Sequence, residues 1–288
     1  MRGNINFDLI KRFSADIRIE TIKAMTKAGY GHIGGAMSIA DILAVLYGAV
    51  MNIDPSNPKL RDRDYLVLSK GHSGPALYAA LALKGYFPIE ALDTLNKPHT
   101  ILPSHCDRLK TPGIDMTTGS LGQGMSTALG IAMGNRLNGL DNYTYCILGD
   151  GELQEGQVWE GAQCAAHHKV DHFIVFVDYN KRQLDGPTNS ICAPLDIVKK
   201  FEAFGFNSMM VKGYDVQEIY DGIQAVKEIS GKPSAMILDT FKGLGCLAAE
   251  KLEFNHYMNF DQTIADQAIA EIERRLIEGT FPKGDVTW

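Results

Sequence analysis

Two short apolar segments, each followed at once by polar residues, constrain the fold of this chain more than any other feature. Residues 143–148 (YTYCIL) run into Gly149-Asp150-Gly151, and residues 172–177 (HFIVFV) run into Asp178-Tyr179-Asn180. Both segments are typical of buried parallel strands, and a helix is predicted between them over 155–170. A right-handed crossover would leave the strands parallel. We therefore expect Asp150 and Asn180 to emerge at the same carboxyl edge, where open α/β sheets bind ligands.

The chemistry at this edge suits a divalent metal that carries phosphate. One carboxylate and one carboxamide make a poor cage for a bare ion, but hard cations take oxygen ligands, and Mg²⁺ prefers few carboxylates plus phosphate oxygens. The flanking Gly149 and Gly151 let the backbone approach a phosphate. Because Asp-Gly alone is common turn chemistry, the indication comes from the pair, with Asp150 at one strand end and Asn180 at the next.

Strands and helices alternate along the chain. This alternation predicts an α/β fold, a doubly wound parallel sheet with helices on both faces, in a single domain over 1–288. An amphipathic helix is expected within residues 1–25, and a helix over 38–51 is predicted to be capped by Ser38, with Asp41 three residues later. The other expected elements are strands over 64–69, 207–212 and 235–240 and helices over 75–84, 216–229 and 263–278.

Composition narrows the classes of partner. The 288 residues include 28 Lys and Arg against 34 Asp and Glu, a net charge of −6, with no basic run. We therefore expect neither nucleic acid nor a membrane as a partner. The first residues are too charged for a signal peptide, and no apolar run is expected to approach a membrane span. The five cysteines form no CxxC pair, which indicates reduced thiols in a cytoplasmic protein.

Two other patterns have weaker interpretations. Gly29, Gly31 and Gly34 match a dinucleotide-binding fingerprint by spacing, but a helix is expected before them where the fingerprint needs a strand, so nicotinamide or flavin binding is disfavoured. A group of possible zinc ligands comprises Cys164, His167, His168 and His172. Since His172 begins a predicted strand, a solvated helix end is the preferred interpretation of this group.

A series of motifs along nearly the whole chain is similar in order and approximate spacing to those of the transketolase family. These motifs are Gly31-His32, Ser69-Lys70-Gly71-His72, residues 117–124 (TTGSLGQG), residues 149–156 (GDGELQEG), Asp178-Tyr179-Asn180-Lys181 and Lys242-Gly243. The chain resembles the amino-terminal, diphosphate-binding half of a transketolase, and specifically the first of the two subunits of an enzyme made from two genes. The family's second half has no room in 288 residues.

The resemblance implies thiamine diphosphate as the cofactor, anchored through Mg²⁺, or through Ca²⁺ or Mn²⁺. The implied metal ligands are the side chains of Asp150 and Asn180 and the backbone carbonyl of Arg182. The residues implied to contact the cofactor are His72, Gly119, Ser120, Leu121, Gly149, Asp150, Gly151, Glu155, Asn180 and His256. Those implied to face the sugar and assist proton transfer are His32, His72, His105 and His256. The sequences around His105 and His256 depart from the family's pattern, and Glu155 would also complement a helix dipole.

The resemblance also implies a partner. Thiamine diphosphate supplies an electron sink while a carbon–carbon bond breaks, and the family places its activating glutamate on a pyrimidine-binding domain. We therefore expect this chain to be inert alone and to transfer a two-carbon ketol group from a ketose phosphate to an aldose only with a pyrimidine-binding transketolase subunit, in an assembly with two copies of each. The alternatives are a 2-oxoacid dehydrogenase component, a deoxyxylulose phosphate synthase or a non-catalytic regulatory subunit. Pentose phosphates, an apiose-derived ketose phosphate and a sulfonated sugar are all open as substrates.

Overall fold

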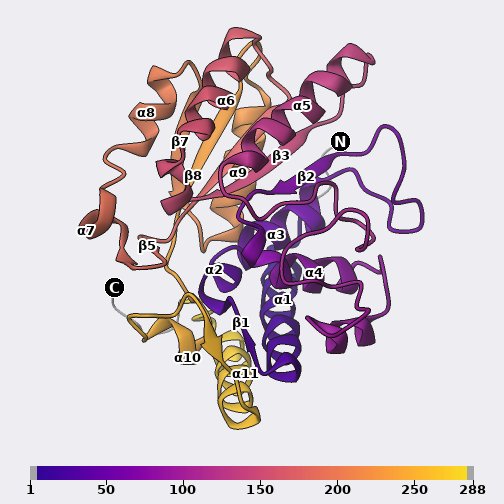
Figure 1. Cartoon of the computed structure of the whole chain (residues 1–288), viewed down its shortest axis with the longest axis vertical. Coiled ribbons are helices and arrows are strands. Elements are labelled where there is room, and N and C mark those ends of the chain that lie inside the picture. Colours follow the sequence, from indigo (N-terminus) through magenta and orange to yellow (C-terminus); the bar gives the residue numbers. More distant parts are fainter. Residues whose placement is uncertain (1–4, 284–288) are drawn as a thin grey trace.

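A five-stranded parallel sheet forms the centre of the molecule (Figure 1). The computed structural model describes residues 5–283. The strand order is β2-β3-β4-β8-β7, and every neighbouring pair in this sheet is parallel. The predicted α/β class is therefore confirmed. The strands are β2 (Tyr65–Leu68), β3 (Thr144–Gly149), β4 (Phe173–Tyr179), β7 (Asn207–Lys212) and β8 (Ser234–Asp239).

Helices cover both faces of this sheet, because successive strand side chains point into two different apolar clusters. On β3, Cys146 and Leu148 join one cluster, whereas Tyr145 and Ile147 join the other. The first cluster packs under α5 (Gln123–Leu137), α6 (Gly156–His167) and α8 (Ile197–Ala203). The second packs under α1 (Phe7–Ala28), α3 (Ala40–Val45), α4 (Gly74–Leu83), α9 (Val216–Lys227) and α11 (Gln262–Ile277). The single-domain assignment over 1–288 stays a prediction.

The helix predicted over 38–51 is present over residues 40–50, but Ser38 does not cap it and its last turn is π-helical. The segment α2 (Ile33–Met37) precedes α3, and α3 runs into the π-helical turn η1 (Leu46–Val50). Ser38 is not the N-cap of α3, a position that Ile39 holds, and its hydroxyl instead donates to Oδ2 of Asp178 at 2.7 Å. Asp41 is fully buried and pairs with Arg18 of α1 at 2.6 Å. Both polar side chains thus serve contacts distant in sequence rather than the start of a helix.

The same region corrects the expectation about apolar runs. Residues 33–50 are long and apolar enough to cross a membrane by length and composition, with a mean hydropathy of 1.8. However, 83% of this window is buried inside the protein. A buried core segment passes the same test as a membrane span, so this run is weak support for a membrane segment.

The remaining expected elements are present, with ends shifted by a few residues. Helix α1 ends at Gly29, which adopts a left-handed φ of 84° as its C-cap. A helix, not a strand, therefore feeds the glycine-rich loop, which argues against dinucleotide binding there. The short strands β1 (Tyr30–Gly31) and β9 (Met258–Asn259) pair antiparallel. The other short elements are η2 (Gly71–Ser73), η3 (Ile89–Thr94), η4 (Gly151–Gln154), β5 (Arg182–Gln183), β6 (Gly186–Pro187), α7 (Thr188–Cys192) and α10 (Leu247–Glu250).

Candidate functional site

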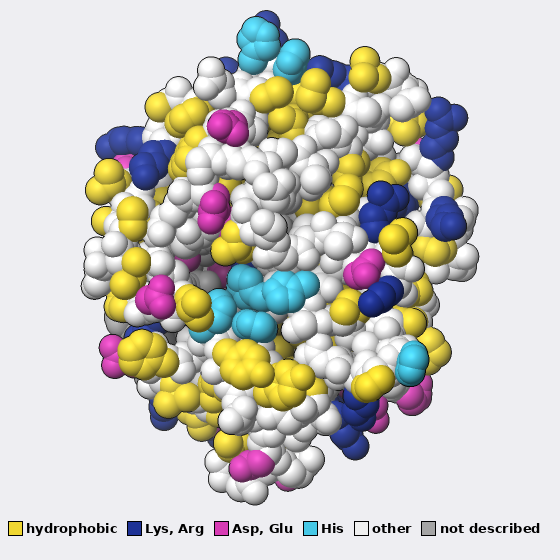
Figure 2. Space-filling view, in the orientation of Figure 1, with side chains coloured by type: hydrophobic (Ala, Val, Ile, Leu, Met, Phe, Trp, Pro, Cys, Tyr) yellow, Lys and Arg dark blue, Asp and Glu magenta, His cyan; other side chains and the backbone are white. Residues whose placement is uncertain are grey.

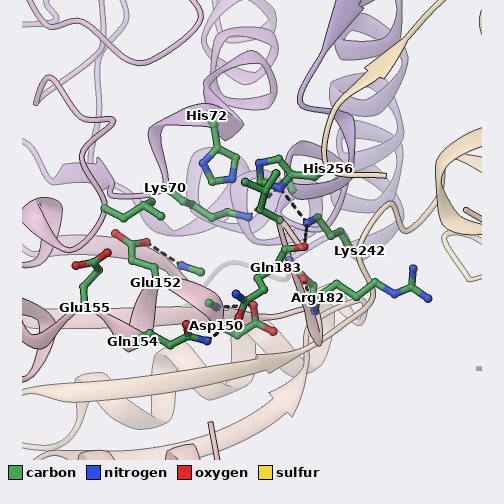
Figure 3. A pocket seen from close by; sticks show the side chains of 16 residues that line it. Lys70, His72, Asp150, Glu152, Gln154, Glu155, Arg182, Gln183, Lys242 and His256 are labelled. Carbon is green, nitrogen blue, oxygen red and sulfur yellow. Dashed lines mark hydrogen bonds between the residues drawn. The ribbon is translucent and has the colours of Figure 1, made fainter. Parts of the chain in front are cut away.

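The carboxyl edge of the sheet is hollowed by a pocket of about 300 Å³ (Figure 3). Its walls come mainly from the residues at or after the ends of β2, β3, β4 and β8 and from the segment before β9, with Gly35 and Leu121 completing them. Open α/β sheets bind ligands at this edge. The pocket therefore lies where the two polar strand ends predicted it.

Asp150 and Asn180 lie together at the ends of β3 and β4. The register pairs Gly149 with Asp178, so each candidate ligand follows the same point along the sheet. Only 2% of Asp150 and 5% of Asn180 is exposed, and both line the pocket together with Arg182. The backbone N–H of Lys181 donates to Oδ2 of Asp150 at 2.6 Å, which links the two strand ends. The structure thus brings together the three residues predicted as metal ligands.

These residues fit a divalent cation that carries phosphate. Burial, followed by the charge of Asp178, raises the pKa of Asp150 to about 7, and a neighbouring cation would favour the ionised carboxylate. Nδ2 of Asn180 donates to Oδ2 of Asp178 at 2.7 Å, which leaves Oδ1 as the acceptor end of the amide. Among the described residues, no group of three or more His, Cys, Asp or Glu could hold a metal. A cation here would need backbone and phosphate oxygens as well.

The group considered for zinc does not assemble. His172 lies before β4 and stacks on Tyr143, with ring centroids 4.4 Å apart. Cys164, His167 and His168 are exposed at the end of α6. Exposed side chains at a helix terminus match the preferred interpretation of a solvated helix end.

A buried ion pair lies beside the pocket, and the argument from strand ends did not predict it. Nζ of Lys70 donates to Oδ2 of Asp178 at 2.5 Å and to the carbonyl oxygen of Gly35 at 2.8 Å. Lys70 is 2% exposed, Asp178 is fully buried, and the hydroxyl of Ser38 reaches the same carboxylate oxygen. Within residues 5–283, Oδ1 of Asp178 has no hydrogen-bond partner. Both charged residues come at or just after a strand end, the signal that could have paired them.

Lys242 and His256 make a second contact that the sequence did not assign. Nζ of Lys242 lies 2.9 Å from Nδ1 of His256 and donates to the carbonyl oxygen of Gln183 at 3.1 Å. Burial, followed by the charge of Lys70, lowers the pKa of Lys242 to about 8. Lys70 and Lys242 both line the pocket, so it offers positive charge to an anion beside the carboxylate that suits a cation.

The four predicted histidines lie close together, and Figure 2 shows a patch of His side chains on this face of the molecule. Pairing of β1 with β9 brings His32 close to His256, η2 carries His72, and His105 lies in the loop that follows η3. The ring centroids are 4.9 Å apart for His72 and His256 and between 5.3 and 5.9 Å apart for His32 and the other three. Only His72 and His256 line the pocket itself.

These imidazoles favour their neutral form. Burial is the largest cause that lowers the pKa of His32, His72, His105 and His256. The pKa of His256 falls to about 3, with the charge of Lys242 adding to burial. The pKa of His72 falls well below its ordinary value, with Lys70 as the next cause. A neutral imidazole has one donor and one acceptor nitrogen, so the cluster can bind hydroxyl groups and take up a proton.

The predicted cofactor contacts divide between the pocket wall and its surroundings. Leu121, Gly149, Gly151 and Glu155 line the pocket. Glu155 precedes α6 without capping it through its side chain. Leu121 comes from the loop before α5 and the other three from the segment at the end of β3, so the wall depends on how these two segments are held together.

Among the described residues, Gly119 and Ser120 do not line the pocket. Gly119 has a φ of 151°, and a Cβ there would lie 3.2 Å from Cδ2 of His105. A larger residue would therefore press on the histidine cluster while adopting an unfavourable backbone conformation. Ser120 is exposed. The contacts predicted for these two residues stay predictions.

The chain is similar to known proteins over most of its length. Residues 10–275 match the family model described as transketolase, thiamine diphosphate binding domain. Over 258 residues the chain is 50% identical to the 6-deoxy-6-sulfo-D-fructose transketolase subunit SqwG of Clostridium sp. strain MSTE9, which covers 90% of this chain and 94% of that protein. Over 256 residues it is 37% identical to an apulose-4-phosphate transketolase subunit of Actinobacillus succinogenes, covering 88% and 92%.

Solved transketolase structures share the fold. The transketolase of Leishmania mexicana superposes with a TM-score of 0.85 at 30% identity, covering 96% of this chain and 42% of that chain. The Campylobacter jejuni enzyme gives a TM-score of 0.85 at 28% identity, covering 98% and 44%. The chain thus spans less than half of each of these structures. It belongs to the transketolase family, and it is a transketolase subunit that carries the family's thiamine diphosphate-binding domain.

Proposed function

We propose that this chain is the cofactor-anchoring subunit of a split transketolase, which transfers a two-carbon ketol group only when a separate pyrimidine-binding subunit joins it. One observation carries the proposal: the pocket joins a buried carboxylate and two lysines to a cluster of neutral histidines. Relatives 50% and 37% identical are named as subunits and are matched over nearly their full lengths, which supports a separate partner. The proposed assembly contains two copies of each subunit and works in the cytoplasm.

The anionic end of the pocket would anchor the cofactor. Thiamine diphosphate, when bound, supplies an electron sink for cleavage of a carbon–carbon bond. Asp150, Asn180 and the carbonyl of Arg182 would hold Mg²⁺, or Ca²⁺ or Mn²⁺ in its place. Lys70 and Lys242 would offset the remaining negative charge of the diphosphate. A side chain at position 151 would collide with Gln183, since a Cβ there would lie 2.8 Å from that residue's Cβ.

The histidine cluster would bind the sugar. Neutral His32, His72 and His105 can accept hydrogen bonds from donor hydroxyls and move a proton at their ring nitrogens. His256 contacts Lys242 and so joins the sugar end of the pocket to its anionic end. Sugar binding and proton transfer are thus assigned to this one cluster, with His256 linking it to the lysines.

For the donor we favour a ketose with a terminal sulfonate over a ketose phosphate. The relative named for 6-deoxy-6-sulfo-D-fructose is 50% identical to the chain, whereas two named for apulose-4-phosphate are 37% and 32% identical. Apulose-4-phosphate and pentose phosphates are the comparison donors.

Reconstitution tests the proposal. The purified chain with thiamine diphosphate and Mg²⁺ should transfer no ketol group from any donor, and adding the pyrimidine-binding subunit should restore transfer, with the highest kcat/KM for the sulfonated donor. An Asp150→Ala complex is the control for turnover by contaminants. Turnover by the chain alone would contradict the split. A complex that binds the cofactor but acts on no donor would instead favour a regulatory subunit.

A further inference from the structure

Glu152 follows the candidate metal ligand Asp150 by two residues, yet its carboxylate serves a different purpose. It lies in η4 and is 2% exposed. Oε1 accepts hydrogen bonds from the hydroxyl of Ser69 and from the backbone N–H of Gly122, the latter at 2.8 Å. Oε2 accepts from the backbone N–H of Gly149 at 3.0 Å (Figure 3). One side chain thus holds donors from three separate segments.

Each of these segments contributes to the pocket or to the histidine cluster. Ser69 follows β2 and precedes the turn that carries His72. Gly122 closes the loop that presents Leu121 to the pocket. Gly149 is the last residue of β3, immediately before Asp150. The carboxylate therefore joins the segments that position the imidazole, the pocket wall and the candidate metal ligand.

The segment that carries Gly122 and Gly124 packs too closely against Ser69 and Glu155 for either glycine to carry a side chain. A Cβ at Gly124 would lie 2.6 Å from Cα of Ser69, and one at Gly122 would lie 2.9 Å from Cβ of Glu155. Gly122 is also the N-cap of α5 and has no side chain to satisfy the helix's first N–H groups. Glu152 reaches this N-terminus from another element.

We propose that Glu152 is a positioning residue for ketol transfer, whose carboxylate fixes loop 119–122 relative to His72 and Asp150. The catalytic part of this inference rests on the proposed function. The positioning part is a property of this chain alone, so it can be tested without cofactor or partner.

Glu152→Gln is the most direct test, because it keeps the shape of the side chain and replaces one of its two acceptor oxygens by an NH₂ group. Its amide group must place an NH₂ against either the Gly149 N–H or the Ser69 and Gly122 donors. At least one backbone N–H then loses its partner and stays buried.

Asp64→Asn is a matched control from the opposite edge of the sheet. Asp64 is 4% exposed and likewise accepts two backbone N–H groups, from Asn52 at 2.9 Å and from Tyr143 at 2.7 Å. It precedes β2 rather than following it. Its loss should lower stability for the same physical reason without touching the pocket.

The first measurement is amide hydrogen exchange of the chain alone, followed by mass spectrometry of peptides covering 117–124. We expect Glu152→Gln to accelerate exchange there roughly tenfold or more by freeing local opening, and Asp64→Asn to leave it as in the wild type. Unchanged exchange in Glu152→Gln, or equal acceleration in both variants, would overturn the positioning role. If Glu152→Gln does not fold, Ser69→Ala removes one donor only and should give a smaller acceleration, whereas no acceleration would overturn the role.

The second measurement is steady-state kinetics of the complex with the pyrimidine-binding subunit, compared at matched cofactor occupancy. We expect Glu152→Gln to lower kcat roughly tenfold or more while the donor KM changes little, because the segments that hold the reacting groups would be misplaced. Wild-type kcat per occupied site, despite faster exchange, would overturn the catalytic part. An inactive wild-type complex would count against the proposed function and leave the exchange result standing.

Discussion

At the scale of single residues, neighbouring charges decide the protonation of the candidate site. His72 and His256 lie 4.9 Å apart, so charging one imidazole raises the cost of charging the other. Lys70 and Lys242 add positive charge nearby, and both lower the pKa of His256 beyond the effect of burial. The negative counterpart is Asp178, which pairs with Lys70. Cations and carboxylates therefore share one end of the pocket, and neutral imidazoles occupy the other.

His72 should matter for turnover more than for assembly. If this imidazole binds donor hydroxyls or moves protons, His72→Ala should cut turnover of the reconstituted complex by roughly 10²-fold or more, the scale of general acid–base groups. Cofactor affinity should stay nearly intact. Kinetics at matched cofactor occupancy and thermal midpoint give the answer. Wild-type turnover per occupied site would make His72 a structural residue.

Asp150 should control cofactor binding. Asp150→Ala should abolish cation-dependent binding of thiamine diphosphate, because it removes the one carboxylate among the proposed ligands and leaves the diphosphate charge poorly neutralised. Asn180→Ala should weaken binding by a smaller margin. Calorimetry of the complex with and without Mg²⁺ measures both, and affinity unchanged by Asp150→Ala would rule out this metal site.

The histidine cluster should make the chain sensitive to acid. Folding lowers the pKa values of these histidines, so the neutral cluster contributes its full share of the unfolding free energy above about pH 6.5, the pKa of an unfolded histidine. That contribution is lost as the pH falls toward the folded pKa, which is about 3 for His256. The thermal midpoint should therefore drop between pH 7 and pH 5, and His256→Gln should lessen the drop by a few degrees. His167→Gln, an exposed control on α6, should leave the drop unchanged. An equal drop in the His256 and His167 variants would contradict this account.

At the scale of elements, the strand ends were predictable and the polar contacts between distant elements were not. Asp150 and Asn180 could be paired because parallel strands place their carboxyl ends together. Ser38 looked like a helix cap by spacing, yet its hydroxyl bonds Asp178, 140 residues away. The segments holding His32 and His256 meet through two-residue strands, whose lengths are too short to carry an alternating pattern.

The ion pair between α1 and α3 should contribute far more to stability than a surface pair on the same helix. Arg18 and Asp41 are almost completely buried, so Asp41→Ala would leave an unpaired buried guanidinium and should cost about 3–5 kcal/mol of unfolding free energy. Asp16→Ala removes a partly exposed partner of Arg12 and should cost about 1 kcal/mol or less. Denaturant unfolding of both variants measures the difference. Similar losses in the two would contradict a special role for burial.

At the scale of the whole molecule, the candidate site draws on residues from Gly35 to His256. The segment between β8 and α11 returns across the carboxyl edge of the sheet. The guanidinium group of Arg182 donates hydrogen bonds to two carbonyl oxygens of this segment, those of Leu252 and Glu253. No local motif contains this arrangement, which explains why Lys242 and His256 could be placed only by resemblance. Just beyond these carbonyls, Phe254 is 66% exposed and Tyr257 is 49% exposed.

We expect the pyrimidine-binding subunit to cover this exposed apolar segment. Phe254 lies two residues from His256 of the pocket, and large aromatic side chains commonly carry binding energy at interfaces. Phe254→Ser should weaken binding of that subunit roughly tenfold or more without lowering the thermal midpoint of the chain, because the side chain is exposed. Leu137→Ser is the control: Leu137 is 86% exposed at the end of α5, about 22 Å along the helix from the pocket loop. Calorimetric titration of each variant with the pyrimidine-binding subunit measures the effect. Wild-type affinity of Phe254→Ser, or equal weakening by both substitutions, would mean that the partner does not approach from the side of the histidine cluster.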